Sequence, residues 1–313
     1  MRGGAELSYQ DVAAVDRMRP AFWLNEGDRS ELGLENRENE AMTSQPIYVL
    51  RHSDHETRRL ATQAAFYAEH TDRLLKMAGI TAGMEVLDVG CGAGDVSIQL
   101  ARIVGPTGSV VGLDADPGVL DSARQRVAEQ NLANVTFRQA ALPDVTLDRP
   151  VDAVVGRMIL MHLPDPAGTI KAVSTLVRPG GVVTFQDLNT TRIRSVPALP
   201  LLTRGIAVVN DCLRAAGRTL DTGERLYSLF REAGLAGPEL AVAVPTPRDK
   251  ESAVVMLGRT LLTALPFAEE SGVITPGDFD ADTLIDQLRE ELRNTPCAVY
   301  LAELVGAWTR LPG

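Results

Sequence analysis

The sequence predicts an α/β fold that is doubly wound around a mostly parallel sheet. Between residues 81 and 188, short apolar segments alternate with segments of helical character, which is the order expected of parallel strands joined by right-handed crossovers. The first apolar segment, residues 86–89, ends at a glycine-rich run and is followed by a helix. In such a fold the ligand crevice lies outside the carboxyl ends of the strands.

A long helix over residues 57–78 precedes the sheet, because Leu60, Ala64 and Tyr67 fall near one face at helical spacing. Pro117 then opens a helix, and the prolines and glycines at residues 179–181 close another. We expect strands at residues 86–89, 109–113, 135–138, 151–156 and 182–186, and helices at residues 95–103, 117–130 and 165–177.

The alternation breaks after Asp187. We expect helices at residues 201–216, 223–233, 250–265 and 280–293, a strand at residues 240–244, and a last strand within residues 298–308 that folds back beside it. Additions of this kind often carry the substrate pocket of an α/β domain.

The chain divides into five segments. Residues 1–41 are an N-terminal extension rich in charged residues and expected to be loose, with one helix near residues 9–18. This extension either precedes a native start at Met42 or is an arm that packs on the domain or on a second subunit. Residues 42–80 form a helical lead segment or lid, residues 81–188 the ligand-binding core, residues 189–237 the cap helices, and residues 238–313 the C-terminal strands with a helical insertion.

The composition argues against several classes of protein. The net charge of −10 opposes broad contact with a phosphate backbone, and there is no run of about 18 apolar residues to span a membrane. The three cysteines are far apart and odd in number, and no Cys or His pair has zinc spacing. The first residues lack the apolar core of a signal peptide, so we expect a cytoplasmic protein. We also expect no metal, and a monomer or a homodimer.

The run GCGAG at residues 90–94 predicts a nucleoside site. Its glycines let the backbone turn tightly and let a ligand approach without a Cβ in the way. The helix that follows presents free N–H groups above the turn. Asp114 ends the second strand 20 residues after Gly94, about where a doubly wound fold places a carboxylate on ribose hydroxyls.

The residue after the turn separates two kinds of nucleoside site. A dinucleotide fingerprint, G-x-G-x-x-G, needs glycine at position 95, where this chain has Asp95. Because an acid at the start of the helix would repel a pyrophosphate, we expect a nucleoside without phosphates. A nicotinamide-dependent oxidoreductase is therefore disfavoured.

The pattern EVLDVGCGAG at residues 85–94, followed by VVGLD at residues 110–114, resembles the class I S-adenosylmethionine (SAM)-dependent methyltransferases. The resemblance covers residues 79–243 and continues through FRQAALP at residues 137–143 and VDAVVGRMILMHL at residues 151–163. It implies a Rossmann-like fold with a seven-stranded sheet and helical cap insertions. It also implies SAM as cofactor and methyl transfer to oxygen, nitrogen or carbon of a small-molecule acceptor, such as a specialised metabolite.

The resemblance implies roles for individual residues. Asp114 would hold the ribose, and Asp88 would hold the amino group of SAM or else only cap the glycine turn. The segment from Gln139, which stands where the family often has an acid, would lie along the adenine. Arg157 would reach a carboxylate, of SAM or of Asp88, or face solvent. The full set expected to bind the cofactor is Asp88, Gly90, Cys91, Gly92, Gly94, Asp114, Ala115, Gln139, Ala140, Ala141, Leu142, Arg157, Met158 and Tyr67.

Catalysis itself needs few residues, because the methyl group of SAM is already activated. His162 is a candidate general base, since its unperturbed pKa of about 6.5 suits proton transfer, or it only orients the loop after the fourth strand. Arg157 is the second catalytic candidate. Arg192, Arg194 and Arg204 would meet an anionic substrate or form a solvated face.

Other functions stay open. The motifs also resemble the quinone-pathway C-methyltransferases, and a SAM-binding protein that transfers no methyl group, such as a cyclisation catalyst or an assembly subunit, has the same core. Nucleic acid is a disfavoured acceptor. Enzymes of the family that act on base amino groups carry Asn/Asp-Pro-Pro-aromatic after the fourth strand, and this chain has GRMI at residues 156–159.

Overall fold

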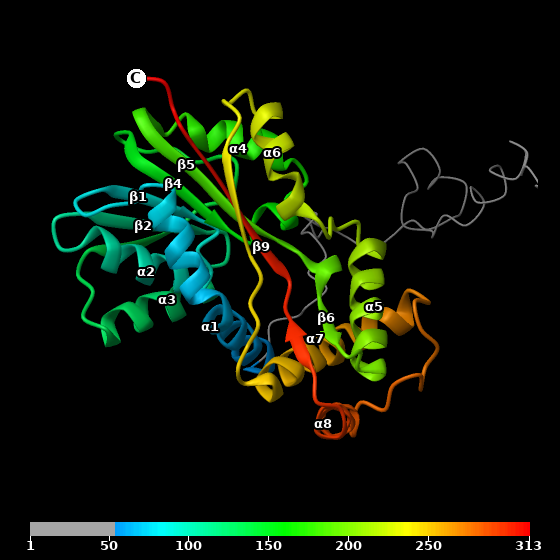
Figure 1. Cartoon of the computed structure of the whole chain (residues 1–313). Helices are drawn as coiled ribbons and strands as arrows, with labels where there is room; N and C mark the ends of the chain where they lie inside the picture. Colours follow the sequence, from blue (N-terminus) through cyan, green and yellow to red (C-terminus); the bar gives the residue numbers. More distant parts are fainter. Residues whose placement is uncertain (1–53) are drawn as a thin grey trace, which may run out of the picture. The chain divides into compact units, whose positions relative to one another are not determined.

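The computed structural model of the protein describes residues 54–313, and within them the chain builds one seven-stranded sheet (Figure 1). The strand order is β3-β2-β1-β4-β5-β9-β7. Strands β1 to β5 are parallel, and β9 is antiparallel to both of its neighbours. The expected fold class is confirmed. The predictions for the extension, residues 1–41, and for its helix lie outside the described residues.

The parallel half follows the predicted alternation closely. Its strands are β1 (Glu85–Val89), β2 (Ser109–Asp114), β3 (Val135–Gln139), β4 (Val151–Arg157) and β5 (Val177–Asn189). The helices that connect them are α2 (Asp95–Val104), α3 (Pro117–Glu129) and α4 (Pro166–Ser174), preceded by α1 (Asp54–Met77). The last strand is longer than expected, because its pairing continues through the glycines before Val182 and past Gln186.

Helices cover both faces of the sheet. Buried aliphatic side chains of α1 and α2 join one apolar cluster, and those of α4 and α6 (Thr222–Glu232) join the other. On the second face Phe230 of α6 meets Phe185 of β5 edge-to-face, with ring centroids 6.2 Å apart. Helix α6, expected among the cap helices, therefore packs on β5 and β9 of the sheet.

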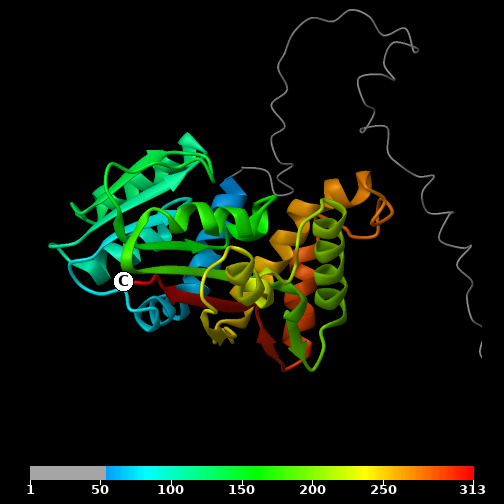
Figure 2. The ribbon, with the colours of Figure 1, turned by 90° about the horizontal axis from the view of Figure 1, so that it is seen from above.

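The cap is built from two distant parts of the chain. Helix α5 (Pro200–Ala215) follows β5, while α7 (Lys250–Glu270) and α8 (Leu284–Asn294) lie between β7 (Glu239–Ala243) and β9 (Glu303–Arg310). The three helices pack together beside the sheet, away from β1 to β3 (Figure 2). A two-stranded ribbon of β6 (Arg194–Val196) and β8 (Ala298–Tyr300), which the sequence did not predict, joins the two parts.

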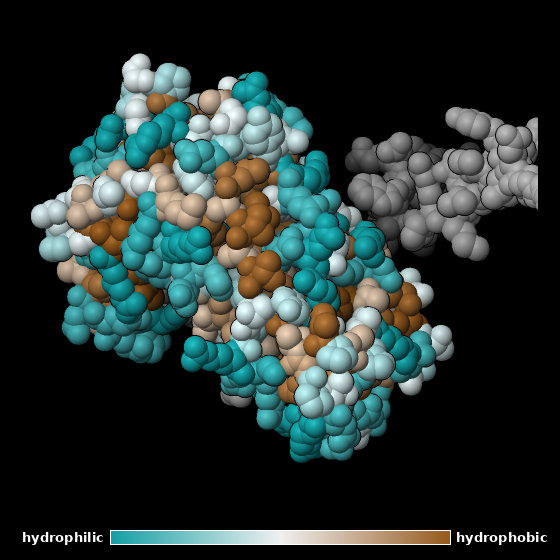
Figure 3. Space-filling view, viewed as in Figure 1, coloured by the Kyte–Doolittle hydropathy of each residue, from teal (hydrophilic) through white to brown (hydrophobic). Residues whose placement is uncertain are grey.

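Strand β7 is an edge of the sheet and pairs with β9, as the predicted fold-back requires. Its Leu240 and Val242 are 46% and 59% exposed, and apolar surface runs over this strand (Figure 3).

No helix within residues 54–313 combines the length and the apolar character that crossing a bilayer requires.

The start of α5 is held by a side chain from α8. Glu291 accepts the backbone N–H of Leu201 at 2.8 Å and that of Leu202 at 3.2 Å. These donors have no partner inside the helix, and a carboxylate near a helix N-terminus is favourable. The contact therefore fixes one helix of the cap against another across about 90 residues of sequence.

Glu291→Ala should lower the free energy of unfolding by about 1–2 kcal/mol, because two N–H donors lose a charged acceptor. Glu290→Ala is the matched control, since the hydrogen bonds of Glu290 go to Arg293 and Asn294 of its own helix. It should change stability clearly less than Glu291→Ala, because exposed ion pairs contribute little. Urea unfolding measures both, and equal effects of the two substitutions would contradict the capping role.

Candidate functional site

The carboxyl ends of β1, β2 and β4 lie side by side at one edge of the sheet. Val89 of β1 is in register with Leu113 of β2 on one side and with Gly156 of β4 on the other. The chain therefore leaves β1 toward β2 and later returns to pair with its other edge. This is the switch point at which open α/β sheets bind their ligands.

The three glycines of the turn have two different surroundings. All have positive φ, at 68° for Gly90, 52° for Gly92 and 81° for Gly94. A Cβ at Gly90 would lie 2.5 Å from Ile159, and one at Gly94 would lie 3.2 Å from Phe137. At Gly92 no heavy atom of the described residues lies within 4 Å of such a Cβ. Gly92 therefore faces open space, while Gly90 and Gly94 are needed for packing.

Asp114 closes the site from β2. Its carboxylate accepts the backbone N–H of Gly92 at 2.9 Å and that of Asp116 at 3.1 Å. The side chain is half-buried, and a carboxylate has lone pairs beyond those two bonds. The predicted ribose ligand thus stands directly beside the open glycine.

The segment predicted to lie along the adenine is adjacent to Asp114. Asp114 and Gln139 are in register at the ends of β2 and β3, and Ala140 donates its N–H to the carbonyl of Asp114 at 2.9 Å. The Gln139 amide donates to the carbonyl of Ala115 at 3.0 Å. The structure therefore brings together Asp114, Ala115, Gln139 and Ala140, and Ala141 and Leu142 follow them in the chain.

Asp88 is buried and tied to the next helix. Its carboxylate accepts the Ser97 hydroxyl at 2.5 Å, so its nearest contact links β1 to α2. Burial raises the pKa of Asp88 to about 6, against the lowering effect of Ser97 and of the Arg157 guanidinium. Cys91 is also buried, its thiol pKa is raised by burial, and its N–H donates to Leu113. The backbone of Cys91 therefore links the glycine turn to β2, while its thiol is buried.

The acid after the turn is not a free charge. Asp95 forms an ion pair with Arg126 of α3 at 2.6 Å, and Arg126 also donates to the carbonyl of Ala93 at 2.6 Å. The prediction that Asp95 repels a pyrophosphate therefore needs correction, because the partner cancels much of the repulsion. The absence of glycine at position 95 still disfavours a dinucleotide site.

Strand β4 ends in a sharp turn of the backbone. Met158 has a φ of 55°, and its N–H donates to the carbonyl of Gln186 at 2.7 Å. A non-glycine residue in this conformation marks a strained site that its surroundings hold in place. The Met158 sulfur also accepts the Gln63 amide at 3.2 Å.

Arg157 points toward α1 and not into solvent. Its guanidinium donates to the Thr71 hydroxyl at 3.1 Å and forms no ion pair with a carboxylate of residues 54–313. Burial lowers its pKa, although Asp95 and Asp88 favour its charged form. Tyr67, expected to touch SAM, is a core residue here, because its ring is buried and its hydroxyl donates to the carbonyl of Ala302 at 2.9 Å.

His162 ends a short 3-10 helix, η3 (Leu160–His162), directly after β4. Burial and the nearby Arg218 guanidinium lower its pKa to about 4, and Arg218 donates to the His162 carbonyl at 2.9 Å. The imidazole is therefore uncharged at neutral pH and is a weak base.

Two polar residues that sequence reasoning missed lie beside this turn. Asp187 is fully buried and accepts the N–H of Leu188 at 2.9 Å and of Met161 at 3.3 Å, which anchors η3. Gln186 is also buried, and its Oε1 has no hydrogen-bond partner in the described part of the chain. A glutamine and an aspartate that end an apolar strand run are the sequence signal that could have found them.

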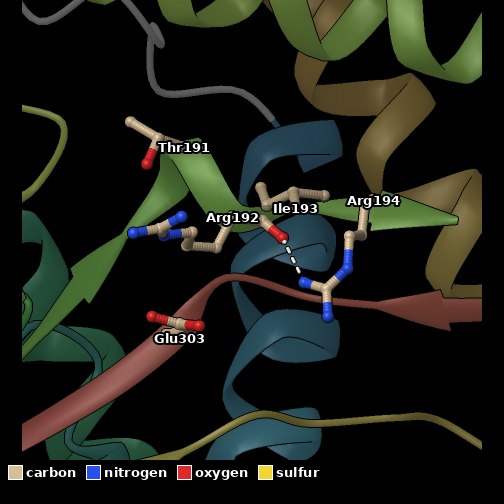
Figure 4. A pocket seen from close by; sticks show the side chains of 5 residues that line it. All are labelled: Thr191, Arg192, Ile193, Arg194 and Glu303. Atoms are coloured by element: carbon tan, nitrogen blue, oxygen red, sulfur yellow. Dashed lines mark hydrogen bonds between the residues drawn. The ribbon is translucent and has the colours of Figure 1, made fainter.

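A separate hollow of about 380 Å³ lies where the chain continues beyond the end of β5. Thr191, Arg192, Ile193, Arg194 and Glu303 line it (Figure 4). Arg192 pairs with Glu224 at 3.2 Å, and Arg194 donates to the Arg192 carbonyl and stacks on Tyr300.

Arg204 lies on the cap and pairs with Asp278 at 3.1 Å. Each of the three arginines considered for an anionic substrate is thus engaged by a neighbour. Within residues 54–313 no cluster of three or more His, Cys, Asp or Glu side chains is arranged to hold a metal ion.

Asp187→Asn should change how stability depends on pH. Burial raises the pKa of Asp187 to about 7 from an ordinary 3.8, so between these values the folded protein holds a proton that the unfolded chain releases. The stability that the Asp187 carboxyl contributes is fully present below pH 3.8, its ordinary pKa, and is lost as pH rises through about 7, its pKa in the folded protein. Relative to the variant, the wild type should lose up to about 1.4 kcal/mol per pH unit across this window.

Urea unfolding of both proteins at about pH 5 and about pH 8 measures this difference. Asp121→Asn, at an exposed ion pair on α3, is the control and should show little change between the two conditions. A wild type that gains stability over Asp187→Asn as pH rises would contradict the assignment.

Comparison with known proteins agrees with this geometry. The sequence model of a family described as a methyltransferase domain matches residues 80–234. The chain is 38% identical over 114 residues to a ubiquinone biosynthesis O-methyltransferase of Acinetobacter baylyi, covering 36% of this chain and 47% of that protein. It is 31% identical over 163 residues to the enzyme of the same name from Albidiferax ferrireducens, covering 49% and 64%. The chain thus spans about half the length of the curated relatives it matches.

A solved structure shares the fold over a larger part of the chain. It is a presumed methyltransferase from Bacillus halodurans, with a TM-score of 0.52 and 17% identity, which covers 78% of this chain and 99% of that one. The order of the strands, the glycine turn with its acid on the next strand, and the matched family lead to one conclusion. Residues 80–234 therefore form a methyltransferase domain of the class I SAM-dependent type.

Proposed function

We propose that this protein transfers the methyl group of SAM to a hydroxyl oxygen of a small-molecule acceptor. The observation that carries the proposal is the pairing of Asp114 with the Gly92 N–H, beside a glycine whose Cβ direction is empty. This arrangement offers a carboxylate for ribose hydroxyls and room for the nucleoside at the switch point of the sheet.

The residues present fit the parts of SAM. Asp114 would hold the ribose, and the segment at residues 139–142 would lie along the adenine, with backbone N–H groups and apolar side chains. The exit of β4 at Arg157 and Met158 would face the methionine part. Asp88 would contribute indirectly, by favouring the charged form of the Arg157 guanidinium.

The chemistry leaves the protein with positioning as its main task. Bound SAM supplies an activated methyl group, and alignment of the acceptor with that methyl can account for roughly 7–11 kcal/mol of the barrier. The acceptor must also release its proton. His162 is a weak base, because burial lowers its pKa to about 4. An acidic hydroxyl such as a phenol, which loses its proton more easily than an alcohol, therefore suits this site better.

The choice of oxygen and of a small acceptor rests on two supports. Two relatives, matched over 114 and 163 residues, are named O-methyltransferases of ubiquinone biosynthesis. The cap of α5, α7 and α8 contacts α1 through α7, and additions to this fold commonly select the substrate. An acceptor with an aromatic ring and a hydroxyl, quinone-like or of specialised metabolism, satisfies both.

Methyl transfer is tested by incubating the protein with SAM that carries a labelled methyl group and a panel of phenols, amines and carbon nucleophiles. Mass spectrometry of the products identifies the atom that gains the label. Labelled phenol ethers support the proposal. Products labelled only at nitrogen or carbon, or binding of S-adenosylhomocysteine without turnover on any acceptor, would contradict it.

Asp114→Ala should weaken binding of S-adenosylhomocysteine by about 1–3 kcal/mol, because charge-assisted hydrogen bonds to the ribose are lost. Asp121→Ala, on an exposed part of α3, is the control and should bind like the wild type. Isothermal titration calorimetry measures both, and an unchanged affinity of Asp114→Ala would remove the ribose assignment.

Gly92→Val should abolish detectable binding, because the branched side chain would fill the open space above the turn. Gly105 has a similar φ of 67° and also faces open space, at the other end of α2. Gly105→Val therefore controls for backbone strain and should retain binding. If both variants lose affinity equally, the effect of Gly92→Val comes from strain and not from the ligand site.

A further inference from the structure

The two edges of the sheet are protected to different extents. At the β3 edge, Thr136 and Arg138 are exposed polar side chains, and Arg138 donates to the carbonyl of Thr146 at 2.7 Å, which ties the following segment to this edge. Strand β7, Glu239–Ala243, is the other edge and contains no lysine, arginine or proline. Charged side chains and proline are what usually prevents an edge strand from pairing with another chain. Strand β7 is therefore the unprotected edge.

The exposed side chains of β7 are apolar on the face of the sheet that α6 covers. Leu240 and Val242 point to this face, because their partners on β9 belong to its apolar cluster, yet both stay exposed. Tyr227 of α6 is also exposed, and its hydroxyl lies beside Gly237, two residues before the strand. An apolar patch beside an unpaired strand edge is a typical interaction surface.

Strand β7 is complementary to a second copy of itself. An antiparallel pair centred on Ala241 places Leu240 of each copy opposite Val242 of the other, and Glu239 opposite Ala243. Each apolar side chain then meets an apolar one, and the single charge of the strand meets a methyl group and no like charge. Such self-pairing about a two-fold axis produces a closed dimer.

Helix α1 brings a second surface to the same place, on the opposite face of the sheet. Thr71 of α1 bonds residues of β4 and β5, while Leu74 lies over Gly306 of β9, which pairs with Ala241. The next residues around the helix in that direction therefore lie on the side of β7. With their neighbours they line a hollow of about 520 Å³: Glu69, His70, Asp72, Arg73, Lys76 and Met77.

The charges along this hollow suit a second copy of the chain. Two acids and two bases balance there, whereas the whole chain carries a net charge of −10, so copies repel each other less at this surface than elsewhere. The two-fold axis through Ala241 reverses α1, so Glu69 and Asp72, which precede Leu74, lie toward Lys76 of the other copy, which follows it. Lys76 already pairs with Asp72 of its own helix at an exposed site, and the second copy extends this pair into a network.

We propose that the protein forms a two-fold dimer in which the β7 strands of two copies pair antiparallel and join the two sheets into one. The two α1 helices flank this junction on one face, and Leu240, Val242 and Tyr227 of both copies cover it on the other. Pro238 and Pro245 bound the strand and confine the pairing to a short stretch. A stable interface buries roughly 1,200–2,000 Å² in total, so we expect this small one to dissociate at roughly micromolar concentrations.

The test measures the association of the full chain by sedimentation at roughly 1–100 µM. Val242→Lys places a charge opposite Leu240 of the other copy and should weaken the dimer at least about tenfold. Thr136→Lys, at an exposed position of the β3 edge, is the matched control and should associate like the wild type. Val242→Lys should bind S-adenosylhomocysteine as the wild type does, so the dimer and the proposed function are tested separately.

A cross-link tests the register of the two strands. Ala241→Cys places two thiols opposite each other across the axis, where Cα atoms of an antiparallel pair lie about 4.5–5.5 Å apart, within reach of a disulfide. Mild oxidation should join the two copies. Ala243→Cys is the control and should form no such link, because Ala243 faces Glu239. The three native cysteines are buried.

The contribution of α1 is tested by reversing one charge. Lys76→Glu should weaken the dimer roughly 5- to 10-fold, because the two-fold axis applies the change twice. Arg124→Glu, in an exposed ion pair on α3, is the control and should leave association unchanged.

The outcomes decide the proposal. A dimer that Val242→Lys dissociates and that Ala241→Cys locks supports it, and circular dichroism identifies any variant that fails to fold. A wild type that stays monomeric up to about 100 µM, a dimer that Val242→Lys leaves intact, or equal cross-linking of Ala241→Cys and Ala243→Cys would overturn it.

Discussion

The hydrogen bond from the Gly92 N–H to Asp114 is the contact on which the functional half of the molecule depends. Parallel strands finish at one edge of the sheet, and the backbone there turns sharply and leaves N–H groups without partners. A carboxylate at the end of the neighbouring strand satisfies one of them and holds the turn in a single conformation. In the function proposed here the same carboxylate also holds the ribose of SAM, so that one residue would serve both the fold and the ligand.

The same edge shows how a packed core and a ligand site share a short stretch of chain. Glycine at position 90 leaves room for Ile159, and glycine at position 94 leaves room for Phe137 of β3. Between them, Gly92 faces open space. On the next strand, Asp187 anchors η3 while Gln186 keeps an oxygen without a partner. Neighbouring residues in the sequence thus divide into those that fix the backbone and those that leave open space or an unpaired polar atom.

Much of this could be predicted from sequence, because local patterns encode it. Apolar strand segments and Pro117 at a helix start predicted the parallel half, which the structure confirms. The spacing from the turn to Asp114 predicted the nucleoside site, which stays a prediction. The contacts that could not be predicted join residues far apart in the chain. Arg126 neutralises Asp95, Glu291 holds the start of α5, and α6 leaves the cap for the sheet. None of these has a spacing that a single sequence reveals, since each depends on the folded arrangement.

Of the three cap helices, α5 lies within the family match, while α7 and α8 lie outside it. The family match ends at residue 234, and the insertion that carries α7, α8 and β8 lies beyond it. Specificity for the acceptor is therefore sought in the cap, and the common chemistry in the sheet. The central claim concerns the sheet, and a crystal structure with S-adenosylhomocysteine tests it most directly. The account predicts ribose hydroxyls within hydrogen-bond distance of the Asp114 carboxylate and the nucleoside above Gly92; a ligand bound elsewhere, with that space empty, would contradict it.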